Sequence, residues 1–246
     1  SIHVLVNEGD TVTSDKYVQV DLLTGDIDSD YELRWYSLRG TEDWSDKYLS
    51  PVGDTKGETK LVVYNPHEYA IDVKITVNDG DSTTNISGGG HFVSEFIKTG
   101  SAALIEETNG SNFIVLSVTD TVGSGVLFDW GFPVVAVRDL TPQVLIGLGF
   151  GCTDIKFLKE RYNKKKTRSV VWVTPTENAD IYVDYQNDGI VDNTYEVNYL
   201  NSKVIHDSAD KDMSGAVIFA TRRGSGPAGP PVDFAAAWGQ DPDRSG

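Results

Sequence analysis

The stretch DYQNDGIVD, residues 184–192, carries side chains that could bind a calcium ion. In calcium loops of the D-x-[DN]-x-[DN]-G type, oxygen ligands come from positions one, three, five, seven and nine, and the glycine permits a sharp turn. Here those positions hold Asp184, Gln186, Asp188, the backbone carbonyl of Ile190, and Asp192. The sequence therefore predicts a calcium site in this loop.

Two departures from the motif predict that such a site is weak. Gln186 supplies a neutral amide oxygen, and Tyr195 stands where an EF-hand has its bidentate glutamate. A second interpretation needs no metal, because Asn187, Asp188 and Gly189 are typical of a tight hairpin turn. Both interpretations remain open at the level of sequence.

Catalytic motifs are missing from the sequence. It contains no G-x-S-x-G, H-R-D or Walker pattern. Glu106 and Glu107 are adjacent, so on a strand they would face opposite sides and would not form a carboxylate pair. We expect a protein that is not an enzyme. The four histidines show neither H-E-x-x-H nor H-x-H spacing: His3, His67, His91 and His206.

Aromatic residues are concentrated between residues 26 and 57, at Tyr31, Trp35, Tyr36, Trp44 and Tyr48. One interpretation is that these rings cap the edge of a hydrophobic core. The other is a stacking platform for sugars, which would make the chain a carbohydrate-binding module or a glycan-active enzyme.

The elements that would position these residues are duplicated. Pro66 ends an apolar segment in LVVYNP and Pro175 ends another in VWVTP, 109 positions later, and the turn Asn-Asp-Gly recurs at the same offset. The pair Trp130-Gly131 recurs 108 positions later, beginning at Trp238. We predict that Trp130 and Trp238 occupy equivalent buried positions in two repeats.

Short apolar segments separated by Gly, Asn, Asp and Ser clusters recur about every ten residues, which is typical of strands in a β-sandwich. The predicted fold is all-β, with internally duplicated sandwich-like modules and a period of about 108; a β-propeller is the alternative. The expected domains are an N-terminal half-repeat at 1–56, a first full module at 57–165 and a second module at 166–246. A half-repeat must be covered by its own chain or by a neighbouring molecule.

Charge disfavours some partners. With 37 acidic and 21 basic residues the net charge is −16, which opposes binding to nucleic acid or to anionic membranes. No run of about 18 apolar residues occurs, so we expect no membrane insertion.

The basic run 156–168 is either a solvated hairpin tip or a docking patch for an acidic surface such as another copy of the protein. Cys152, the single cysteine, excludes an internal disulfide.

Seven segments, spread over nearly the whole chain, form a recognisable set. They are VTSDKYVQVDLLTGDI, ELRWYSL, DWSDKYLSPVG, LVVYNP, DWGFPVV, VWVTPTENADIYVDY and AAAWGQDP. Together they resemble a region of large bacterial surface proteins that is similar to the amino-terminal domain of the IgGFc-binding protein. The resemblance implies an extracellular, cell-surface β domain with a structural or adhesive role. We further expect assembly with other copies or neighbouring β domains, head to tail into a filament or layer, and consider surface glycans as partners.

Overall fold

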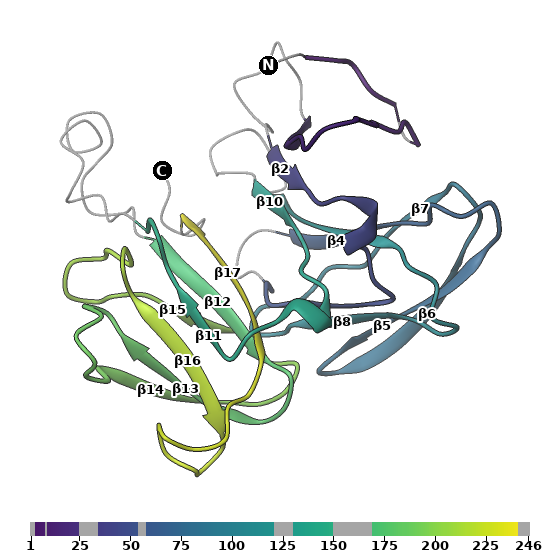
Figure 1. Cartoon of the computed structure of the whole chain (residues 1–246). Helices are drawn as coiled ribbons and strands as arrows, with labels where there is room; N and C mark the ends of the chain where they lie inside the picture. The colour runs from purple at the N-terminus through teal and green to yellow at the C-terminus, as the bar shows by residue number, and fades with distance from the viewer. Residues whose placement is uncertain are drawn as a thin grey trace.

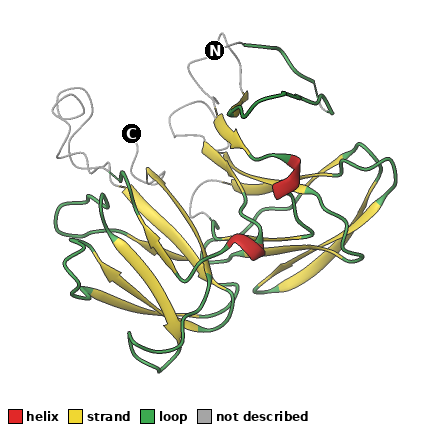
Figure 2. Ribbon diagram, viewed as in Figure 1, coloured by secondary structure: helices red, strands yellow, loops and turns green. Residues whose placement is uncertain are grey.

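The computed structural model describes residues 3–7, 9–24, 34–53, 58–120, 130–149 and 169–240. Figure 1 shows two sandwiches of strands lying against each other, and Figure 2 shows that two short helical turns are the helical parts of the described chain. The predicted all-β sandwich fold is confirmed. The sheets stack in facing pairs around two cores, so the propeller alternative is not supported.

The first module consists of two antiparallel sheets, with strand orders β3-β8-β5-β6 and β10-β9-β4-β7. Its core lies between them and combines residues of both, such as Val73 and Ile105 from one sheet with Leu61 and Val115 from the other. The strands are β3 (Lys47–Ser50), β4 (Glu58–Tyr64), β5 (Ile71–Val77), β6 (Gly80–Ile86), β7 (His91–Val93), β8 (Ala103–Glu107), β9 (Ile114–Asp120) and β10 (Trp130–Pro133).

The second module repeats this arrangement strand for strand, with sheets β11-β16-β13-β14 and β15-β12-β17. Taken in chain order, β11 to β17 occupy the places of β3 to β9. In the second module, no described strand takes the place that β10 has beside β9. The strands are β11 (Gln143–Leu145), β12 (Ser169–Pro175), β13 (Ala179–Asp184), β14 (Asn193–Val197), β15 (Lys203–Ile205), β16 (Val217–Arg222) and β17 (Phe234–Gln240).

The first module begins before residue 57, since β3 from the expected half-repeat pairs with β8. Upstream of it, β1 (Val20–Thr24) and β2 (Arg34–Leu38) form a two-stranded sheet, and β2 lies along β10. Tyr36 on β2 is buried and its hydroxyl lies close to Gly131 on β10. This part of the N-terminal region is therefore covered by its own chain.

The two modules are duplicates, but the offset of 109 residues predicted from the sequence differs by one residue from the offset between corresponding strands. Leu61 and Val63 point into the first core, and the residues that point into the second core are Val171 and Val173, 110 positions later. In the next strand, Ile71 corresponds to Ala179, an offset of 108. A one-residue shift moves every side chain to the opposite face of its sheet, so the average offset matches neither strand.

The predicted equivalence of Trp130 and Trp238 is wrong. Trp130 lies in β10, an edge strand that pairs with β9, whereas Trp238 lies in β17, which pairs directly with β12. The side chain of Trp238 is also 46% exposed and belongs to no core. The recurring Trp-Gly pair is therefore a coincidence of sequence in strands that occupy different places.

Side chains of both modules form the junction between them. Val52 and Phe132 from the first module pack against Val170, Trp172 and Ala237 from the second. This contact explains why β12 is buried along its whole length: Val171 and its alternate neighbours face their own core, and Trp172 faces the other module. The two sandwiches thus share a hydrophobic interface, which favours one fixed arrangement.

Backbone hydrogen bonds add to this junction. The N–H of Ala102 donates to the carbonyl of Leu200 at 2.9 Å, and the N–H of Ser202 donates to the carbonyl of Gly100 at 2.8 Å. Around them, Leu49 and Leu104 pack against Leu200. The contact therefore resembles a short piece of β-ladder that runs between the modules.

Candidate functional site

The loop 185–192 joins β13 to β14, where the first module has only a two-residue turn between β5 and β6. Asp184 is 5% exposed, and its carboxylate accepts hydrogen bonds from the N–H groups of Asp188 at 3.1 Å and Gly189 at 2.8 Å. Gly189 and Asn187 have positive φ, which such a compact loop requires. Asp184 therefore satisfies backbone donors that the loop turns inward.

The other acidic residues of this loop act in the same way. Asp188 accepts from the N–H of Ile190 at 2.9 Å, and Asp192 accepts from the N–H of Tyr185 at 2.7 Å. The Ile190 side chain is exposed, and Gln186 lies on the surface of the loop. Within the described ranges, no group of three or more His, Cys, Asp or Glu side chains is placed to hold a metal ion. Calcium binding by Asp184, Gln186, Asp188, Ile190 and Asp192 stays a prediction.

The aromatic cluster is divided by the fold. Tyr48 belongs to the first core and Tyr36 is buried, as expected of rings that cap a core edge. Trp35 is 61% exposed, Trp44 is half-buried, and Tyr31 lies outside the described residues. Trp35 and Trp44 are therefore the two tryptophans of this segment that have surface for a ligand.

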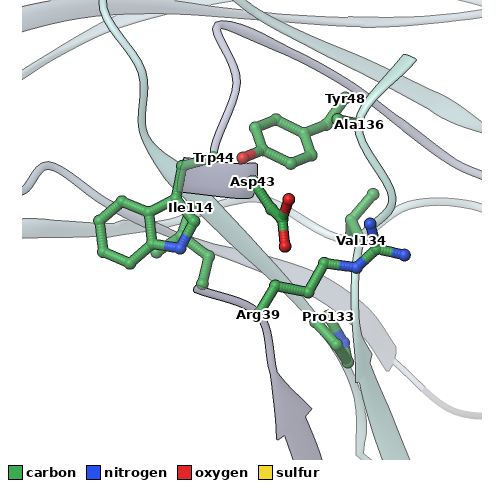
Figure 3. A pocket seen from close by; sticks show the side chains of 8 residues that line it. All are labelled: Arg39, Asp43, Trp44, Tyr48, Ile114, Pro133, Val134 and Ala136. Carbon is green, nitrogen blue, oxygen red and sulfur yellow. The ribbon is translucent and has the colours of Figure 1, made fainter. Parts of the chain in front are cut away.

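Trp44 lines a shallow recess at the edge of the first module (Figure 3). Its floor is apolar, formed by Ile114, Pro133, Val134 and Ala136, and its enclosed part has room for about one water molecule. The indole N–H of Trp44 is buried without a hydrogen-bond partner. The recess is much smaller than the roughly 300–1,000 Å³ of typical small-molecule pockets.

The charged residues that line the recess are Arg39 and Asp43, and Asp43 lies on the helical turn η1 (Thr41–Asp43). Two residues of the second helical turn, η2 (Val137–Asp139), hold this region in place. Arg39 forms an ion pair with Asp139 at 3.2 Å, and Arg138 donates to the backbone carbonyl of Trp44 at 3.1 Å. These contacts fix the position of Trp44 at the edge of the recess.

Tyr48 forms the inner wall of the same recess. Its hydroxyl donates to the carbonyl of Phe113 at 2.5 Å and accepts from the N–H of Ser45 at 2.8 Å, and burial raises the pKa of the phenol. A phenol held neutral in this way has a structural role, because both of its hydrogen-bonding functions serve the backbone.

The remaining sequence candidates fall in two groups. The basic run 156–168 and Cys152 lie outside the described residues. Of the histidines, His67 stacks on Tyr69 with ring centroids 4.7 Å apart and has Nε2 2.8 Å from the carbonyl of Asn112. That contact anchors the loop after β4 to the start of β9, and no motif in the sequence indicated it.

Comparison with known proteins adds little. No protein-family model matches the chain, and no curated protein matches it. Among solved structures it is similar to the oxalate decarboxylase of Lactobacillus farciminis in complex with formate, at 10% identity over 80% of this chain and 74% of that one. The TM-score is 0.25, too low for any conclusion about fold or activity. Within the described part of the chain, no helix is long and apolar enough to cross a membrane.

Proposed function

We propose that this chain is a non-enzymatic, structural or adhesive β region of an extracellular surface protein, built to continue into further modules or copies of itself. The observation that carries this proposal is the position of β10. This strand immediately precedes η2 and β11 of the second module, yet it pairs with β9 and extends the sheet of the first. The strand that leads into the second module thus belongs to the first.

Such a connection suits a protein that spans distance or bears load. A rod that is pulled at its ends must keep its modules aligned, and here the hydrophobic cluster around Trp172 and the ladder at Ala102 resist bending at the junction. The resemblance of the sequence to bacterial surface proteins supports an extracellular location. A net charge of −16 is compatible with that location, because it keeps an exposed surface soluble.

Two measurements test this proposal. Electron micrographs of the purified chain over a range of concentrations should show elongated assemblies that lengthen with concentration. Antibodies against the chain should label intact, unpermeabilised cells of the source organism. Isolated particles at every concentration, together with labelling only after permeabilisation, would contradict it.

Trp44 supports a second candidate function, binding of a glycan. Its indole N–H has no partner, and Arg39 and Asp43 provide polar groups beside an apolar floor; aromatic and polar groups in this combination bind sugars through stacking and hydrogen bonds. A glycan array would separate the two functions. Saturable binding that is lost in Trp44→Ala and Trp35→Ala, with unchanged melting temperatures, would favour the glycan module.

A further inference from the structure

The junction between the two modules is made by two apolar faces, one on each module. On the first module, Leu49 and Leu104 are opposite each other in the β3–β8 ladder and pack against Leu200 and Ala235 of the second. Val52, a few residues after Leu49, packs against the outer face of β12 and β17. The three side chains that the first module contributes are at most 7% exposed. Because the modules are duplicates, each face has an equivalent on the other module.

The second module carries the equivalent of the face that the first module buries, but exposed. The β11–β16 ladder pairs Leu145 with Val217, at the places that two buried leucines occupy in the β3–β8 ladder. The interval from the start of β11 to Leu148 equals that from the start of β3 to Val52. Leu145 is 57% exposed, Leu148 is 67% exposed and Val217 is half-buried. We call Leu145, Leu148 and Val217 the head face.

The first module carries the equivalent of the other half of the junction. The β4–β9 ladder pairs Val62 with Leu116, as the β12–β17 ladder pairs Trp172 with Ala237. Trp172 and Ala237 are buried in the junction, whereas Val62 and Leu116 are half-buried. An apolar pair that faces the other module in one copy of the fold is therefore partly open to solvent in the other.

Trp44 and Ile114 belong to the same face. Trp44 and Leu140 directly follow the helical turns η1 and η2, and each donates its N–H to the carbonyl of the first residue of its turn. Leu140 packs on the junction cluster that contains Ala235. Ile114, which lines the recess beside Trp44, has in β9 the place that Ala235 has in β17. We call Val62, Ile114, Leu116 and Trp44 the tail face.

We propose that the head face of one copy of this chain packs on the tail face of a second copy, as the first module packs on the second within the chain. This inference rests on the proposed function and names the surfaces through which copies would join. A second copy fits both faces, because it offers the complementary half of an interface that already forms inside the chain. The contact is head-to-tail and does not close on itself, so it extends into a filament.

The contact between copies differs from the junction in one charge and one hydrogen bond. Lys60 stands where the second module has Val170, and its ammonium lies 4.2 Å from the centre of the Phe96 ring, so its charge already has a partner. The N–H of Gly215 donates to Ile146 within its own module, whereas the equivalent N–H of the first module donates across the junction. We therefore expect a reversible contact that dissociates on dilution.

Variants with one blocked face test this contact by sedimentation over a range of concentrations. Leu145→Lys blocks the head face and Leu116→Lys blocks the tail face, since each contact would bury an unpaired charge. The native chain should form oligomers that grow with concentration, and each variant alone should associate at least tenfold more weakly. Mixed in equal amounts, the two variants should form a dimer through the one native head and the one native tail. That dimer should not grow, because both of its free ends carry a lysine.

Two further variants serve as controls, and melting curves establish that every variant is folded. Ile190→Lys changes a side chain that is 66% exposed and lies outside both faces, so it should associate like the native chain. Leu148→Lys blocks the head face at a second exposed position and should behave like Leu145→Lys. These head variants retain most of the folded packing, because both leucines are exposed.

The outcomes separate this contact from self-assembly in general. If the native chain associates and both head variants associate equally well, the contact proposed here is wrong and assembly by another surface remains. A mixture of folded head-blocked and tail-blocked variants that stays monomeric would also reject the contact, because the two faces would then not meet. If the native chain is monomeric at every concentration, both this contact and self-assembly are wrong.

Discussion

Phe113 and Phe234 hold the same place in the two modules, 121 residues apart. Phe113 immediately precedes β9 and Phe234 begins β17. Each is almost fully buried and donates its N–H to a carbonyl just before the first strand of its module, that of Ser45 or Thr141. Phe113 is also in contact with the ring of Tyr48, 5.2 Å between centroids. Phe113 and Phe234 are therefore equivalent residues of the two modules, whereas Trp130 and Trp238 are not.

Their shared position predicts equal effects of truncation. Phe113→Ala and Phe234→Ala should each lower the free energy of unfolding by about 3–5 kcal/mol, because each leaves a cavity in a sandwich core. Trp238→Ala is the contrast, since its exposed side chain should cost less than about 1 kcal/mol. Urea denaturation measures all three variants. A loss for Trp238→Ala as large as for the phenylalanines would contradict the assignment of strands.

Gly131 provides a test of how β2 lies on β10. A Cβ added there would lie 2.4 Å from the hydroxyl of Tyr36 and 2.6 Å from the carbonyl of Ser117. Gly131→Ala should therefore destabilise the chain by about 1–3 kcal/mol. Gly147→Ala is the matched control, because a Cβ at Gly147 meets nothing within 4 Å. Equal stability of both variants would show that β2 does not pack there.

Tyr36 predicts a loss of stability in alkali. Burial raises its pKa to about 12 from an ordinary value of 10.0. The unfolded chain therefore loses this proton at a lower pH than the folded chain, so the stabilisation is fully present below pH 10 and is lost as the pH rises toward 12. The loss should be about 1–3 kcal/mol. In Tyr36→Phe the decline in melting temperature over this range should be smaller, whereas an unchanged decline would contradict the burial of the phenol.

The loop 185–192 predicts two separate effects. With a chelator present, Asp184→Ala should cost about 1–3 kcal/mol, because the N–H groups of Asp188 and Gly189 lose their acceptor. If the calcium hypothesis is right, calcium at about 10 mM should stabilise the native chain by about 1.4 kcal/mol for a dissociation constant near 1 mM. Asp188→Ala should lose that increment. A native melting curve that calcium leaves unchanged would reject the hypothesis.

The sequence by itself determined the fold class and the existence of a repeat. Alternating apolar residues between turn-forming clusters, as in IDVKITV, specify a half-buried strand through local geometry, which requires no knowledge of distant residues. Turn-forming residues likewise predicted the connection between β13 and β14, at Asn187, Asp188 and Gly189. It could also foresee that some rings near Tyr48 cap a core, because so many aromatics exceed what a solvated loop needs.

Only the tertiary structure decided which face of each strand is buried and which strands correspond. Val170 and Trp172 are as apolar as Val171 and Val173, so no pattern in β12 separates the residues that face their own core from those that face the first module. The offset between modules changes from 110 at Leu61 to 108 at Ile71, because the connecting loops differ in length while hydrogen bonding fixes the register of each strand. Among the described residues, β9 has β10 on its outer side and β17 has no such strand, a difference that becomes visible only when the two modules are compared in space.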